Sequence, residues 1–158
     1  MQNLNNTLLE RSKSKKSRKF VFGLLGLSFL GFLDALYLTI LHYASIPVSC
    51  GAFTECSRVL SSEYAVVLGI PLAALGIVYY LAVFLSAAFF LDTERRIFLL
   101  AASLLPFMGL VASGFFLYLQ IAVIEALCPY CLVSAIITLL LACVAVYALW
   151  ISRTEISL

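Results

Sequence analysis

Charged residues are scarce in this chain of 158 residues: Asp, Glu, Lys and Arg together make up only 11% of it, whereas 64% is hydrophobic. A soluble globular domain is about one quarter charged, and a disordered chain has few apolar residues. Both classes are therefore excluded. The chain also has only five cysteines, which are too few for a small scaffold held together by disulfides. The composition indicates a protein that has lipid as its solvent.

The sequence contains long runs with few or no charged residues. Asp34 is the only Asp, Glu, Lys or Arg between Lys19 and Glu55, and three charge-free runs of 28, 28 and 27 residues follow Glu63, Arg96 and Glu125. One helical crossing of a bilayer needs about 20 apolar residues, so each run is long enough for one crossing. We expect an all-α, polytopic membrane protein, a bundle of four transmembrane helices at about 20–41, 66–91, 97–119 and 128–151.

The basic residues predict the orientation of these helices. Six of the ten Lys and Arg residues lie in the first 19 residues. If the N-terminus is cytoplasmic, nine of the ten lie on the cytoplasmic side and only Arg58 lies outside. We therefore expect a basic cytoplasmic tail (1–19), a membrane domain (20–151) and a cytoplasmic C-terminal tail (152–158) in a multi-pass protein of the cell membrane.

This topology places four of the five cysteines on the outer face. Cys50 and Cys56 fall in the first outer loop, and Cys128 and Cys131 form a Cys-Pro-Tyr-Cys motif at the start of the fourth helix. Disulfides persist in the oxidising compartment outside the cytoplasm. Two cysteine pairs there indicate dithiol–disulfide chemistry, although a zinc site or two structural disulfides would use the same residues.

The Cys-Pro-Tyr-Cys motif has a physical rationale at a helix start. Proline suits the first helical position, so Pro129 would begin the helix and Cys128 would cap it. Free amides and the positive end of the helix dipole stabilise a thiolate there. We expect Cys128 to face the outer loop and Cys131 to point into the bundle.

Two further segments carry expectations. The residues after Cys56, with an apolar Val59 and Leu60, predict a short helix in the membrane interface that could cover the outer mouth of the bundle. Cys143 lies 12 residues beyond Cys131 with no cysteine near it in sequence. We expect it to be a small buried apolar residue.

The motifs together resemble the vitamin K epoxide reductase (VKOR) family, above all its microbial members. The resemblance rests on three segments in this order: Cys50-x5-Cys56 followed by Ser-Arg-Val-Leu-Ser-Ser62, then Gly69-Ile-Pro-Leu-Ala73 with Gly76 and Tyr79, then Cys128-Pro-Tyr-Cys131. It covers about residues 23–146.

The resemblance implies a four-helix bundle that holds a quinone (ubiquinone, menaquinone or a related one) near its outer mouth. It implies that Cys131 reacts with the quinone and that Cys128 is its partner in the active-site disulfide. Cys50 and Cys56 would be the shuttle pair, which takes electrons from a thioredoxin-fold protein, and Ser62 would lie close to the quinone. Microbial relatives use this relay to keep a DsbA-like oxidase oxidised, so that secreted proteins acquire disulfides.

Two departures from the family pattern refine the expectation. Many microbial members carry a fused thioredoxin-like domain after the fourth helix, and this sequence ends soon after Trp150, so we expect the partner to act in trans. Animal members have a tyrosine four residues after the second active-site cysteine, where this chain has Ala135. Quinone-coupled thiol oxidation is therefore expected rather than epoxide reduction. A DsbB-like enzyme would carry its two cysteine pairs in the reverse order.

Asp34 is the one acidic residue inside a span. Ionisable groups within a membrane are costly and are often functional. One interpretation is that Asp34 relays protons or forms a hydrogen bond near the quinone. The other is that it ties helices together as a neutral or hydrogen-bonded acid.

Overall fold

The computed structural model describes residues 2–44, 56–60, 62–67, 69–93 and 95–154. Its long helices are α1 (Gln2–Tyr43), α3 (Leu72–Thr93), α4 (Arg96–Ala122) and α5 (Pro129–Thr154). Between α1 and α3 lie the short helix α2 (Cys56–Leu60), a 3₁₀ turn (Glu63–Ala65) and the two-residue strands β1 (Val66–Val67) and β2 (Ile70–Pro71). The strands pair antiparallel, with Val66 opposite Pro71 and Val67 opposite Ile70.

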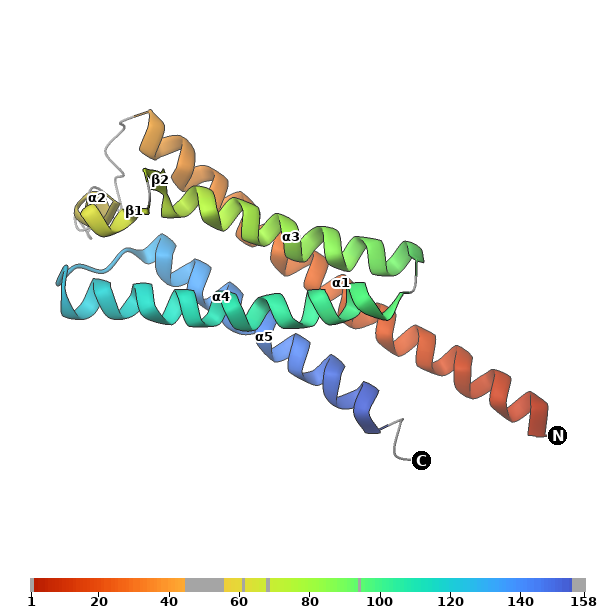
Figure 1. Ribbon diagram of the computed structural model, residues 1–158. Coiled ribbons are helices and arrows are strands. Elements are labelled where there is room, and N and C mark those ends of the chain that lie inside the picture. Colours follow the sequence, from red (N-terminus) through yellow and green to blue (C-terminus); the bar gives the residue numbers. More distant parts are fainter. Residues whose placement is uncertain (1, 45–55, 61, 68, 94, 155–158) are drawn as a thin grey trace.

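Each long helix contains a stretch that is long and apolar enough to cross a membrane. These spans are Lys19–Tyr43, Leu72–Thr93, Ile97–Ala122 and Pro129–Tyr147. The helices pack in a ring in which α1 contacts α3 and α5, and α4 contacts the same two helices. Figure 1 shows α2, β1, β2 and the start of α5 at one end of the bundle and both chain termini at the other. The predicted all-α membrane bundle is confirmed.

Three details differ from the sequence-based expectation. The helix of the first span begins at Gln2 and continues through the basic tail, since residues 2–19 contain neither Gly nor Pro. The second long helix begins at Leu72 rather than near residue 66. Gly69, with a φ of 81°, turns the chain between the two strands, and the β-branched Val66 and Val67 favour an extended backbone.

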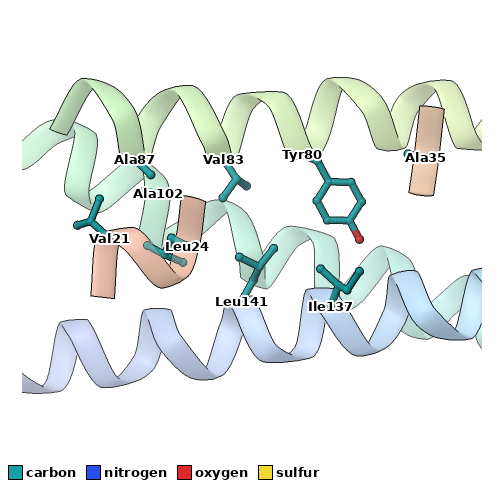
Figure 2. Packing of buried hydrophobic residues seen from close by; sticks show 9 residues of the cluster. All are labelled: Val21, Leu24, Ala35, Tyr80, Val83, Ala87, Ala102, Ile137 and Leu141. Carbon is teal, nitrogen blue, oxygen red and sulfur yellow. The ribbon is translucent and has the colours of Figure 1, made fainter. Parts of the chain in front are cut away.

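The core of the bundle is apolar and draws on all four long helices. Figure 2 shows Tyr80 and Val83 of α3 pointing toward Ile137 and Leu141 of α5, with residues of α1 and α4 around them. The buried members of this cluster are Val21, Leu24, Ala35, Tyr80, Val83, Ala87, Ala102, Ile137 and Leu141. The Tyr80 hydroxyl lies 2.8 Å from Ser134 Oγ and 3.0 Å from Thr138 Oγ1, and it donates to the Ser134 carbonyl oxygen. This network ties α3 to α5.

Two glycines allow the consecutive tyrosines of α3 to fit between their neighbours. A Cβ on Gly31 of α1 would overlap the Tyr80 ring, and a Cβ on Gly109 of α4 would overlap the Tyr79 ring. Close approach of helix backbones at small residues is typical of membrane bundles. The two glycines therefore set the positions of both tyrosine side chains.

Cys143 does not lie inside the bundle, so the expectation that it is a small buried residue is wrong. Its side chain is exposed on the face of α5 that points away from the bundle. Twelve residues at 3.6 residues per turn rotate it about 120° from Cys131 around the helix axis. A residue on the face that contacts α1 or α4 would instead share the rotation of Leu141 or Ala145, which are buried.

The Gly31–Tyr80 contact leads to a stability prediction. Replacing Gly31 with Ala should destabilise the protein by about 1–3 kcal/mol, because the new methyl group forces the Tyr80 ring or the two helices apart. Gly26→Ala is the matched control on the same helix, since no atom lies within 4 Å of the added Cβ. Unfolding by denaturing detergent would measure both. Equal stability of the two variants would contradict the tight contact.

Candidate active site

A cavity of about 390 Å³ lies between the four long helices, a volume within the usual range of small-molecule sites. Leu60 of α2, Ala65 of the 3₁₀ turn and Pro71 of β2 belong to its lining, so the segment between α1 and α3 helps to enclose it. Most of the lining is apolar. The polar or ionisable lining residues are Asp34, His42, Tyr79, Tyr80, Ser113, Gln120, Cys131, Ser134 and Thr138.

The Cys-Pro-Tyr-Cys motif begins α5 at the wall of this cavity. The first helical residue is Pro129, and the Cys128 carbonyl oxygen accepts the amide hydrogen bond of Leu132, which makes Cys128 the N-cap. Cys131 lies one turn inside the helix and lines the cavity. The side chain of Cys128 is fully buried and that of Cys131 is partly buried, and both carry free thiols in this structure.

The surroundings of Cys128 stabilise its thiolate. The Cys131 thiol donates a hydrogen bond to the Cys128 sulfur and thereby lowers the pKa of Cys128 to about 7, well below that of an ordinary thiol. Burial opposes this change, while the backbone N–H groups of Tyr130 and Cys131 lower the pKa further. These amides are unpaired donors of the first helical turn, which an N-cap side chain ordinarily satisfies.

The short helix α2 covers Cys128. Val59 of α2 is fully buried in a cluster with Ile124, Ala126 and Cys128, against which Phe116, Tyr130 and Cys131 pack. The predicted short helix is therefore present, and it closes the outer side of the thiol pair. Cys128 faces this loop segment, as expected, but is shielded by it rather than open to water.

Gln120, at the end of α4, holds the loop that carries Cys128. Its side chain is buried, and its Oε1 accepts a hydrogen bond of 3.1 Å from the Cys128 backbone N–H. Its backbone carbonyl oxygen accepts a second hydrogen bond, from the Ala126 N–H. One residue thus binds both halves of the α4–α5 loop, in which Glu125 adopts a left-handed backbone (φ 53°). The position of Cys128 depends on this residue.

The structure places the other residues singled out from the sequence as follows. Asp34 lines the cavity together with Cys131. Cys56 is the first residue of α2, and Cys50 lies outside the described residues. The hydroxyl of Ser62 donates a 2.7 Å hydrogen bond to the Val59 carbonyl oxygen, and Ser62 is not among the described residues that line the cavity. The chemical roles of all these residues stay predictions.

The sequence predicted a covering segment with Val59, but it did not identify Gln120 as a support or Tyr79 as a cavity residue. A signal existed for Gln120, which is the only Asn or Gln after residue 6. A carboxamide in an otherwise apolar span needs an internal partner, and that partner is the Cys128 amide. Tyr79 looks like an ordinary aromatic residue of a span and carries no comparable signal of a place in the cavity.

The hydrogen bond between the two thiols leads to a pH prediction. In a protein with Cys50, Cys56 and Cys143 replaced by Ser, thiolate ultraviolet absorbance should rise with a midpoint near pH 7, the pKa of Cys128. Adding Cys131→Ala removes the main donor to the thiolate, so the midpoint should move to higher pH. Val133→Ala, at an exposed position of the same helix, is the control and should keep the midpoint. A midpoint that Cys131→Ala leaves unchanged would contradict the assigned cause.

The role of Gln120 leads to a second prediction here. Gln120→Leu should lower the free energy of unfolding by about 1–3 kcal/mol, because the buried Cys128 N–H loses its acceptor. Ser103→Ala is the control on the same helix: Ser103 is buried too, but its hydroxyl forms no hydrogen bond within the described residues. Detergent unfolding would compare them. A Gln120→Leu variant as stable as Ser103→Ala would show that the loop does not need this bond.

Comparison with known proteins agrees with this arrangement of helices and cysteines. A search of the curated proteins found no match. The Vitamin K epoxide reductase family, in contrast, matches residues 23–146, a range that contains parts of all four spans, both cysteine pairs and the whole lining of the cavity. Because this match covers most of the chain, the protein belongs to the vitamin K epoxide reductase family, whose members are membrane thiol oxidoreductases linked to quinones.

Proposed function

We propose that this protein is a membrane thiol:quinone oxidoreductase. In this proposal, Cys50 and Cys56 take electrons from a thioredoxin-fold partner that acts in trans. They pass the electrons to Cys128 and Cys131, and from there the electrons reach a quinone, so that secreted proteins acquire disulfides. The observation that carries the proposal is the position of Cys131, which lines an apolar cavity and hydrogen-bonds a partner thiol at the helix start.

The cavity suits a quinone in its chemistry. A quinone ring is flat and apolar apart from its carbonyl oxygens, so it needs an apolar site with a few polar groups. The lining supplies both, and Asp34 and Tyr79 there each carry a buried polar atom with no hydrogen bond to any described residue. When bound, a quinone supplies the capacity to accept two electrons from a dithiol, together with two protons.

The thiol steps follow from the chemistry of disulfide exchange. A thiolate of the shuttle pair attacks the Cys128 sulfur of the Cys128–Cys131 disulfide, forms a mixed disulfide and expels Cys131 as a thiolate. The second shuttle thiolate then attacks the mixed disulfide, which restores the shuttle disulfide and releases reduced Cys128. The lowered pKa of Cys128 makes its sulfur a good leaving group in this second exchange.

The burial of Cys128 supports a relay rather than direct reduction by the partner. Val59 covers Cys128, so a folded protein cannot reach this sulfur while α2 stays in place. Cys56 begins the same five-residue helix, three residues before Val59. In this proposal, a movement of α2 brings a shuttle thiol to Cys128, whereas a thiol of the partner protein is excluded.

The orientation in the membrane follows from charge. The end of the bundle with α2 and the start of α5 lies opposite both termini (Figure 1), and the basic residues gather at the ends with the termini. By the positive-inside rule, we place the termini in the cytoplasm and the cysteine pairs at the outer or periplasmic face of the cell membrane. There the partner would be a secreted DsbA-like protein.

Ser62 is a proposed contact of the bound ring. It lies between Leu60 and Ala65, which both line the cavity, and its hydroxyl is partly buried. The hydroxyl also bonds the Val59 carbonyl oxygen, which fixes the end of the covering helix. In this proposal, Ser62 couples the position of α2 to the presence of the ligand.

One assay tests the proposed function. The purified protein in detergent is mixed with a reduced thioredoxin-fold protein and ubiquinone-1 or menadione, and quinone absorbance is followed. We expect thiol-dependent loss of this absorbance, and Cys131→Ala should abolish it because no active-site disulfide can form. Cys143→Ala is the control and should retain the rate of quinone reduction, since Cys143 is exposed on the face of α5 that points away from the bundle. Failure of the wild-type protein with both quinones would reject the function.

A further inference from the structure

Two polar atoms on the cavity wall are buried and form no hydrogen bond with any described residue. They are Oδ2 of Asp34, on α1, and the hydroxyl oxygen of Tyr79, on α3. Buried polar groups nearly always form a hydrogen bond, because a group without one loses its hydration free energy and gains nothing in return. Inside a membrane bundle this cost is at its greatest, since lipid offers no partner. Two unpaired groups in one cavity therefore point to a ligand that pairs with them.

The bundle does pair its neighbouring buried hydroxyls. Tyr80, next to Tyr79, bonds Ser134 and Thr138, and Thr138 in turn donates to the Ser134 carbonyl oxygen. Thr138 donates its one hydroxyl proton to the Ser134 carbonyl oxygen and so does not donate to Tyr79. Tyr79 is held in the cavity by the close fit of its ring against Gly109. Its hydroxyl oxygen forms no hydrogen bond with any described residue, so its proton is available to a ligand in the cavity.

Asp34 and Cys131 line the same cavity, Asp34 from α1 and Cys131 from the first turn of α5. No Lys or Arg belongs to the lining among the described residues, and His42 is the basic side chain there. In its protonated form, the Asp34 carboxyl group can donate a hydrogen bond to a carbonyl oxygen.

We propose that Asp34 and Tyr79 form the polar end of the quinone site: Asp34 is the proton donor to a quinone oxygen, and the Tyr79 hydroxyl donates a binding hydrogen bond. This inference rests on the proposed thiol:quinone activity and assigns the source of one proton in it. Asp34 is then a catalytic residue, and Tyr79 is a binding residue.

The assignment balances the reaction. With Cys128 as a thiolate and Cys131 as a thiol, formation of the disulfide releases two electrons but only one proton. Reduction of a quinone to a quinol takes up two electrons and two protons. The Asp34 carboxyl group supplies the second proton and becomes a carboxylate, which accepts a hydrogen bond from the quinol. Cys128 releases one proton when it ionises, and Asp34 later takes up one proton to return to its acid form. These two protons cancel in the overall reaction.

Two variants separate the two roles. Asp34→Asn keeps a hydrogen-bonding side chain but cannot give up a proton, so single-turnover reduction of ubiquinone-1 by the reduced protein should slow about 100-fold with its dissociation constant unchanged. Tyr79→Phe should weaken binding of ubiquinone-1 to the oxidised protein about two- to tenfold, as loss of one neutral hydrogen bond predicts. It should also raise the infrared stretching frequency of the bound carbonyl. Asp34→Glu should restore part of the rate.

Controls distinguish this inference from the proposed function and from misfolding. Ser103→Ala removes the third unpaired buried polar atom, which lies outside the cavity lining, and should change neither binding nor rate. An unchanged circular-dichroism spectrum and an unchanged midpoint of detergent unfolding in every variant would show an intact fold. If wild-type protein reduces ubiquinone-1 and both variants match it in rate, affinity and carbonyl frequency, only this inference fails. If wild-type protein neither binds nor reduces ubiquinone-1 or menadione, the proposed function fails and this inference fails with it.

Discussion

The structure depends on one constraint: a polar group inside the bilayer must find its partner within the protein. The backbone meets it by forming four helices, and the side chains meet it by a few specific bonds. Tyr80 pairs with Ser134 and Thr138 and so connects α3 with α5. Gln120 pairs with the Cys128 amide and so fixes the loop at the start of α5. The same constraint makes the unpaired groups of Asp34 and Tyr79 conspicuous, because they form no hydrogen bond with any described residue.

Much of the fold could be predicted from the sequence, because lipid imposes a minimum length on each span. Charge-free runs located all four crossings, and a proline between two cysteines located the start of α5. The β1–β2 turn could not be predicted in the same way. Val66 and Val67 are as apolar as residues of a transmembrane span, so hydropathy predicted a second helix that includes them. In the structure, Gly69 and Pro71 precede this helix, which begins at Leu72. Hydropathy measures affinity for lipid and carries little information about the local backbone.

The candidate site was predictable only in part, for a related reason. Spacing and the helix start indicated which cysteines could react and that Cys131 points inward. The rotation of a helix about its axis decides which other residues share the cavity, and an almost uniformly apolar helix gives no periodic signal for it. Cys143 illustrates this limit, since it was expected inside the bundle and lies outside. Gln120 illustrates the opposite case, in which one isolated carboxamide marks an internal bond.

The two thiols of the Cys-Pro-Tyr-Cys motif are shielded from water on both sides, by a covering residue on one side and by an apolar cavity on the other. On the loop side, Val59 buries Cys128 and excludes water and external thiols. On the inner side, Cys131 opens into an apolar cavity that only a lipid-soluble oxidant would favour. Burial alone would raise the pKa of Cys128 and make its thiolate scarce, but the Cys131 thiol and two backbone amides reverse the effect. The helix start therefore does two things at once: it allows a reactive sulfur to be shielded, and it keeps that sulfur ionised. In the proposed relay, the shielded thiolate exchanges only with the thiol that the covering segment brings to it, and this selectivity is what electron transfer from a thioredoxin-fold partner to a quinone would require.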